Sequence, residues 1–174
     1  MTNHLYDAVF GRHAGSDRIF LYTADGEISF AAFAALTNRL ANLLVAEGLA
    51  PGDRVAVQAD KSVMLLALYA ATVKAGGVYL PLNTGYTASE LDYFLGDAKP
   101  RIVVVAQAAE AQIAPIAERG GAALLTLDAD EAGSLRDGAM KQDADFTAVP
   151  RGSEDLAAIL YTCLLYTSPS PRDS

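Results

Sequence analysis

Apolar residues follow two patterns along this sequence, which together predict alternating strands and helices. Short runs such as residues 102–105, with four consecutive β-formers, predict strands buried on both faces. Longer stretches with apolar residues spaced three and four apart predict helices with one buried face. The clearest helical stripe is Phe33, Leu36, Leu40, Leu43 and Leu44. Ser29 precedes this stripe and is suited to cap the helix, and Gly48 is suited to end it.

The full set of expected elements alternates between the two types. Strands are expected at residues 19–23 and 27–29, joined as a hairpin, and at 54–58, 78–80, 102–105, 123–127 and 156–160. Helices are expected at residues 5–10, 30–47, 63–74, 88–98, 108–119 and 134–140. Pro115 should kink or split the helix that contains it. The alternation predicts an α/β fold, with a mostly parallel layered sheet and helices on both faces.

A candidate phosphate-binding site is indicated by residues 155–162, which read Asp-Leu-Ala-Ala-Ile-Leu-Tyr-Thr. Their five-residue apolar run predicts a buried strand, with a helix turn as the alternative. A phosphate-binding loop would need glycines and a lysine next, so that backbone N–H groups can approach an anion. The residues after Thr162 contain neither. The sequence therefore contains the strand that would lead into a phosphate-binding loop, but not the glycines and lysine of the loop itself.

The last twelve residues, 163–174, have a composition unlike the rest of the chain. Their sequence can be encoded by a DNA string that resembles a transposon-type adapter of sequencing libraries. We therefore expect two parts: a natural portion at 1–162 and a non-native tail at 163–174. The alternative is a natural, divergent carboxyl terminus.

Composition and charge narrow the classes of function. The 174 residues are 52% hydrophobic, enough for one domain with a sizeable core. The net charge of −8 argues against nucleic acid and against an acidic membrane surface as partners. The sequence shows no leader and no apolar run of spanning length, so a cytoplasmic location is expected.

The residue types that bind metals are scarce. Cys163 is the only cysteine, which excludes a disulfide framework and a cysteine metal cluster. His4 and His13 have no ligand partners near them in the sequence, and no metal site is expected. No general base, activated nucleophile or metal triad is recognisable in residues 1–162, so no catalytic residue is predicted there.

Three polar clusters have a structural and a functional interpretation. Residues 74–77, Lys-Ala-Gly-Gly, fit a helix carboxyl terminus better than an anion loop. Asn83, Thr84 and Tyr86 fit a polar turn better than a pocket lining. The acids at 128, 130 and 131 lack the spacing of a calcium loop and are expected to form a solvated surface.

Four motifs carry a resemblance to a known family. They are residues 21–30, 52–56 (Gly-Asp-Arg-Val-Ala), 73–83 (Val-Lys-Ala-Gly-Gly-Val-Tyr-Leu-Pro-Leu-Asn) and 155–162. In these motifs the chain resembles the amino-terminal part of AMP-forming acyl-CoA synthetases, which belong to the adenylate-forming ligases. The resemblance implies that the chain is an incomplete amino-terminal part of a larger adenylate-forming domain. Within the family, residues 61–62, 79–87 and 90–94 are most similar to malonyl-CoA synthetases.

The resemblance implies a function for the parent protein. Such an enzyme uses ATP and Mg²⁺ to convert a carboxylic acid, here malonate, into an acyl-adenylate, and then passes the acyl group to coenzyme A. Only Thr162 matches a nucleotide-binding residue of the family, the threonine that opens the phosphate loop. The loop lysine, the magnesium-binding acid and the adenylation lysine have no counterpart, so this chain is expected to be inactive. Two alternatives stay open: a naturally short, non-catalytic binding or scaffold domain, and a fragment of an enzyme that adenylates an amino acid or aryl acid.

Overall fold

The centre of the computed structural model, which describes residues 2–161, is a sheet of four parallel strands. The strands are β3 (Arg54–Gln58), β4 (Val78–Pro81), β5 (Ile102–Val105) and β6 (Ala123–Thr126). Their order across the sheet is β4-β3-β5-β6, so the first strand along the chain is internal. Val55 lies opposite Tyr79 on one side and Ile102 on the other, which fixes the register of the central pairs.

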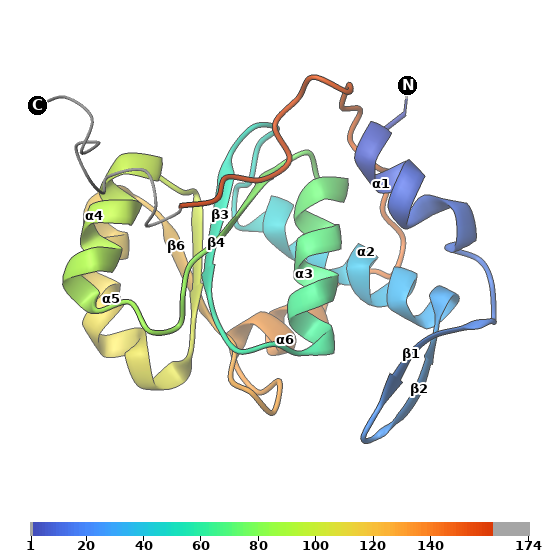
Figure 1. The fold of residues 1–174 in the computed structure, drawn as a ribbon, viewed down its shortest axis with the longest axis horizontal. Coiled ribbons are helices and arrows are strands. Elements are labelled where there is room, and N and C mark those ends of the chain that lie inside the picture. Colours follow the sequence, from blue (N-terminus) through green and yellow to red (C-terminus); the bar gives the residue numbers. More distant parts are fainter. Residues whose placement is uncertain (1, 162–174) are drawn as a thin grey trace, which may run out of the picture.

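Helices cover both faces of this sheet, as the sequence predicts (Figure 1). The helices are α1 (His4–Val9), α2 (Phe30–Ala46), α3 (Val63–Lys74), α4 (Ala88–Ala98), α5 (Gln107–Gly120) and α6 (Ser134–Ala139), with a 3-10 turn η1 (Gly11–His13). One core joins α4 and α5 to the sheet through residues such as Ala56 and Val103. The other joins α2, α3 and α6 to the opposite face through Val55 and Val104. Neighbouring strand residues therefore point into different cores, and the predicted α/β fold is confirmed.

A hairpin stands apart from the main sheet. It consists of β1 (Ile19–Thr23) and β2 (Gly26–Ser29), which pair antiparallel. The hairpin leads directly into α2, and the Ser29 hydroxyl accepts a hydrogen bond from the Ala32 N–H at 3.2 Å, which confirms the predicted cap. None of the helices formed by residues 2–161 has the length and apolar character needed to cross a membrane.

Two expectations about local structure need correction. The first concerns Pro115, which the sequence predicts to kink or split its helix: α5 runs unbroken from Gln107 to Gly120, so the split is wrong and the kink stays a prediction. The proline removes one backbone donor, but the packing of Ile113 and Ala117 into the core holds the helix together on both sides of it.

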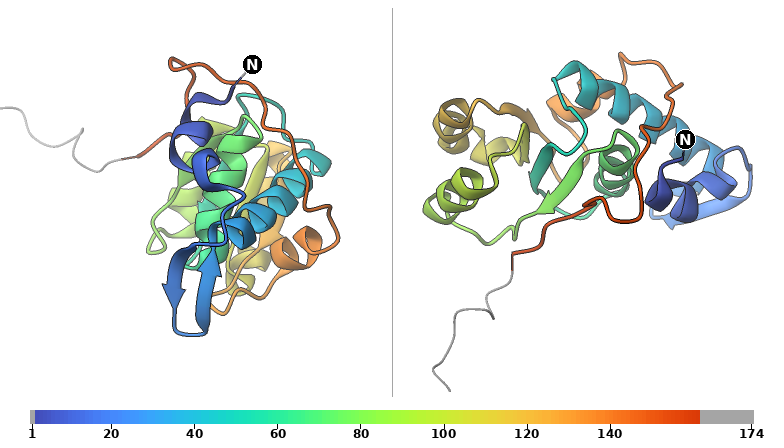
Figure 2. Two further views of the ribbon diagram at one scale, coloured as in Figure 1. Left: turned by 90° about the vertical axis from the view of Figure 1, so that its right-hand side faces the viewer. Right: turned by 90° about the horizontal axis from the view of Figure 1, so that it is seen from above.

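The second correction concerns residues 156–161, which do not form the buried strand that the apolar run predicts. They are extended and make one isolated parallel bridge, between Ala158 and Tyr79 of β4. Leu156 and Leu160 are 63% and 69% exposed, while Ile159 and Tyr161 pack against the core under α4. The run therefore lies at the edge of the sheet with one buried face, and Figure 2 shows it beside β4. The apolar run by itself does not distinguish one buried face from two.

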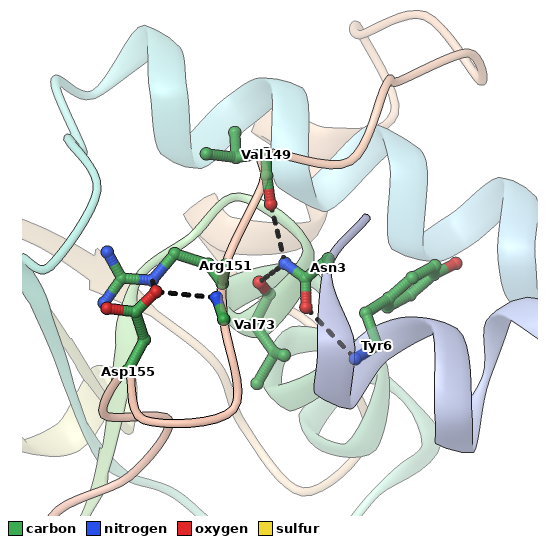
Figure 3. A network of polar contacts seen from close by, with 7 residues as sticks. Asn3, Tyr6, Val73, Val149, Arg151 and Asp155 are labelled. Carbon is green, nitrogen blue, oxygen red and sulfur yellow. Dashed lines mark hydrogen bonds and ion pairs between the residues drawn. The ribbon is translucent and has the colours of Figure 1, made fainter. Parts of the chain in front are cut away.

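Asn3 ties the two ends of the described chain to the core (Figure 3). Its side chain is 1% exposed, and its amide donates hydrogen bonds to the carbonyls of Val73 at 2.8 Å and Val149 at 2.9 Å. Its side-chain oxygen accepts from the Tyr6 N–H at 3.1 Å and caps α1. One residue thus joins the start of the chain, the end of α3 and the segment that leads to residues 156–161.

We expect the substitution Asn3→Asp to lower the free energy of unfolding by about 2–3 kcal/mol, measured by urea denaturation. The carboxylate keeps the cap on α1 but cannot donate to the two buried carbonyls. Asn42→Asp is the matched control, because Asn42 also donates to two carbonyls, of Asp143 and Asp145, both at 2.9 Å, but at the surface. Equal effects of the two substitutions would contradict the role assigned to Asn3.

Candidate functional site

The carboxyl ends of the four parallel strands lie along one edge of the sheet, where ligands bind in folds of this type. A cavity of about 700 Å³ opens there, between the ends of β3 and β4. Tyr79 and Leu65 contribute to its apolar wall, and Lys61, Asn83 and Thr84 contribute polar groups. A second hollow of about 340 Å³ contains Thr84 as well and extends to the start of α5. The two hollows together form the candidate site in residues 2–161.

The loop after β4 is a polar turn, as predicted, and it also lines the cavity. The Asn83 side chain accepts a hydrogen bond from the Gly85 N–H at 2.8 Å. Gln58, at the end of β3, donates to the carbonyls of Asn83 at 2.8 Å and Tyr86 at 3.0 Å. Because Gln58 is only 8% exposed, this buried amide fixes the turn against the sheet. Sequence reasoning did not single out Gln58, whose only signal is a polar residue at the end of a buried strand.

The acids after β6 close the amino termini of two helices instead of forming a purely solvated surface. The Asp128 carboxylate accepts from the N–H of Gln107, the first residue of α5, at 2.8 Å. The Glu131 carboxylate accepts from the N–H of Met64 in the first turn of α3 at 2.8 Å. Both carboxylates also lie at the favourable end of a helix dipole. The earlier expectation of a solvated surface is therefore corrected for Asp128 and Glu131.

These caps limit anion binding at the carboxyl ends of the strands. An anion site at a helix amino terminus needs free backbone N–H groups. In α3 the Ser62 hydroxyl accepts from the Leu65 N–H at 3.1 Å, in addition to the Glu131 contact. In α4 the Thr87 N–H donates to the Glu90 carboxylate at 2.8 Å, as part of a capping box. The helix amino termini of α3, α4 and α5 are thus already engaged by side chains.

Residues 74–77 form a helix carboxyl terminus, as expected, and not an anion loop. Gly76 follows α3 with a φ of +81°, a conformation that favours glycine. The Lys74 side chain turns into the protein, with its ammonium 4.8 Å from the centre of the Tyr6 ring and a hydrogen bond to the Asn38 side chain. Burial lowers the pKa of Lys74, and the nearby Asp7 charge opposes that shift. This lysine is therefore part of the packing between α1, α2 and α3.

The extended segment before Thr162 lies against β4 and α4. The Tyr79 N–H donates to the Ala157 carbonyl at 2.9 Å, and the Ile159 N–H donates to the Tyr79 carbonyl at 3.0 Å. The pairing is parallel, so the segment runs in the direction of β4, towards the carboxyl edge. Thr162, the predicted nucleotide-binding residue, lies outside the described residues, as does the 163–174 tail with Cys163. Both predictions stay predictions.

Several acids of residues 2–161 are engaged in structural contacts. Within that range no cluster of three or more His, Cys, Asp or Glu side chains could hold a metal ion. Asp92 pairs with Arg119 at 2.6 Å, and the Glu90 carboxylate accepts from the Thr87 N–H at 2.8 Å, so each of these acids has its own partner. The described part supplies the walls of the candidate site at the carboxyl ends of the strands.

Comparison with known proteins places the chain in one family. The family described as AMP-binding enzyme matches residues 10–163. The curated long-chain-fatty-acid–CoA ligase FadD13 of Mycobacterium tuberculosis is 32% identical over 140 residues, which cover 80% of this chain and 28% of that protein. Novobiocin biosynthesis protein H of Streptomyces niveus is 35% identical over 132 residues, which cover 74% of this chain and 21% of that protein.

Solved structures extend the similarity to the whole described fold. The apo structure of MatB from Rhodopseudomonas palustris is 50% identical, with a TM-score of 0.89, over 93% of this chain and 32% of that chain. An ATP-bound structure of the same protein matches with the same figures. The chain thus spans about a third of that structure's length and less than a third of the curated relatives.

The cap formed by Asp128 yields a stability prediction. We expect Asp128→Ala to lower the free energy of unfolding by about 1 kcal/mol, because the first N–H of α5 loses its partner. Asp130→Ala is the control, since Asp130 accepts only from Ala132 N–H at 3.0 Å within the same loop. Its expected effect is within about 0.5 kcal/mol. Urea denaturation of both variants tests the difference, and an equal loss would refute the assigned cap.

Proposed function

Because this chain belongs to the family of AMP-binding enzymes, we propose that its parent protein is an ATP-dependent acid–CoA ligase. The acid would react with ATP to give an acyl-adenylate and pyrophosphate, and coenzyme A would then take the acyl group with release of AMP. Mg²⁺ would accompany ATP. The observation that carries the proposal is the family match over residues 10–163, together with a 50% identical structure that binds ATP.

We further propose that malonate is the acid. The support is the resemblance of residues 61–62, 79–87 and 90–94 to malonyl-CoA synthetases and the 50% identity to MatB. Two of these stretches contribute to the cavity, through Lys61, Tyr79 and Asn83, and the third lies in α4, where Glu90 completes a capping box. Part of the resemblance therefore lies at the candidate site.

A second candidate keeps the adenylation step and changes the acid. Enterobactin synthase component F of Escherichia coli is 46% identical over 65 residues, and a dimodular nonribosomal peptide synthase of Bacillus subtilis is 32% identical over 100 residues. These matches favour an amino acid or aryl acid as the substrate. They cover 37% and 58% of the chain, less than the 93% covered by MatB, so malonate is the preferred proposal.

In the parent protein, residues 2–161 would act as the scaffold that brings the chain to Thr162. Thr162 would open the phosphate loop, and the residues that hold Mg²⁺ and the acyl group would lie further along. On this proposal residues 163–174 replace the natural continuation, and the 174-residue chain is inactive. A non-catalytic binding or scaffold domain is the competing proposal, and it requires the tail to be natural.

Genomic DNA across the codons for residues 155–174 distinguishes these proposals. We expect the natural gene to continue after Thr162 into a glycine-rich loop and a long open frame. A stop codon shortly after a natural Ser174 would overturn the ligase proposal for this chain and leave the scaffold domain.

The substrate proposal is tested with the enzyme encoded by that longer open reading frame. Pyrophosphate release would be measured with ATP, coenzyme A and a panel of malonate, methylmalonate, acetate, a long-chain fatty acid, an aryl acid and an amino acid. We expect kcat/KM for malonate to exceed that for the fatty, aryl and amino acids by at least about a hundredfold, because buried polar groups shaped for a second carboxylate would stay unpaired with those acids. A preference for an aryl or amino acid would support the second candidate, and the 174-residue chain is the inactive control.

A further inference from the structure

Asp97 occupies a position on α4 that helix electrostatics does not favour. It is the penultimate residue of the helix Ala88–Ala98, where the dipole is negative and a carboxylate is repelled. The last turn itself contains no lysine or arginine, but the Arg54 guanidinium donates to the carbonyls of Ala98 at 2.7 Å and Lys99 at 2.8 Å and so engages this end of the helix. The Asp97 carboxylate has a separate partner, from another part of the chain.

The partner is Tyr161, at the other end of the described chain in sequence. The Tyr161 hydroxyl donates a hydrogen bond to the Asp97 carboxylate. The tyrosine ring packs on Phe94, one turn earlier on α4, with 4.6 Å between ring centres. Burial, followed by the hydrogen bond to Asp97, raises the pKa of Tyr161 to about 12, as expected for a phenol that donates to a carboxylate.

The backbone alone does not hold the end of this segment. The bridge to β4 uses Ala157 and Ile159, and within residues 2–161 no backbone hydrogen bond involves Leu160 or Tyr161. Leu160 is 69% exposed and adds little packing. The contacts of the Tyr161 side chain with Asp97 and Phe94 are therefore what fixes the last described residue.

We infer that Asp97 is a positioning residue for the nucleotide site: it holds Tyr161, the described residue that directly precedes Thr162 in the sequence. The inference rests on the proposed function, in which Thr162 opens the phosphate loop. Asp97 does not touch the reacting groups. Its effect is to lower the entropy cost of binding ATP, because the residue before Thr162 is already held in place.

The first test measures the anchoring itself in the 174-residue chain, by hydrogen exchange of the Ile159 amide. We expect Asp97→Ala and Tyr161→Phe to speed this exchange by about fivefold, because each removes the same hydrogen bond. Asp97→Asn, which keeps an acceptor oxygen, should restore most of the protection. Asp92→Ala is the matched control, since Asp92 is an exposed acid on α4 that pairs with Arg119 instead. Unchanged exchange in Asp97→Ala and Tyr161→Phe would overturn the inference, whatever the function of the parent protein.

The second test measures the consequence for the reaction, in a chimera in which residues 2–161 replace the matching third of R. palustris MatB. Exchange of pyrophosphate into ATP in the presence of malonate reports adenylation. We expect Asp97→Ala to raise KM for ATP by about fivefold with a smaller change in kcat, and Asp97→Asn to rescue KM. Asp92→Ala should leave KM unchanged.

The outcomes of the two tests separate the two proposals. Faster exchange of the Ile159 amide with an unchanged KM in the chimera would overturn the positioning role. A chimera that fails to exchange pyrophosphate before any substitution would count against the scaffold role proposed for residues 2–161. In that case the anchoring of Tyr161 by Asp97 is still decided by hydrogen exchange.

Discussion

The parallel direction of all four central strands is the constraint on which the rest of the structure depends. Parallel strands cannot be joined by tight hairpins, so each of the first three is followed by a crossover that returns the chain to the amino ends of the strands. The crossovers here contain α3, α4 and α5, and they cover both faces. The same constraint collects every strand's carboxyl end at one edge, where the cavity beside Lys61 and Asn83 opens.

Once the sheet is set, the unpaired backbone groups of the helices and loops need partners. The structure supplies many of them from distant side chains: Asn3 serves the carbonyls of Val73 and Val149, and Glu131 serves the N–H of Met64. Each such contact joins two elements that the sheet alone would leave free to move. Because these groups are buried or half-buried, leaving them unpaired would cost more than an exposed contact does.

Many polar side chains of the described residues are used as hydrogen-bond partners within the fold, which is typical of a scaffold. Asp128 and Glu131 each accept from an N–H group in the first turn of a helix, and Asp92 pairs with Arg119. On the proposed function, the phosphate loop begins after Tyr161, and the contact of Tyr161 with Asp97 on α4 joins the scaffold to the residue that precedes that loop.

The sequence by itself determined the features that depend on neighbours in the chain. Ser29, Ser62 and Thr87 cap helices that begin within three residues of them, and Gly76 ends α3, so these were predictable from local spacing. The buried strand at residues 102–105 and the α/β alternation were predictable because burial on both faces demands continuous apolar residues. The tertiary structure alone decided the long-range contacts, since Asp97 and Tyr161 are 64 residues apart and Glu131 and Met64 are 67 apart. It also decided that residues 156–161 lie beside β4 with one face buried, because an apolar run alone does not distinguish burial on one face from burial on both.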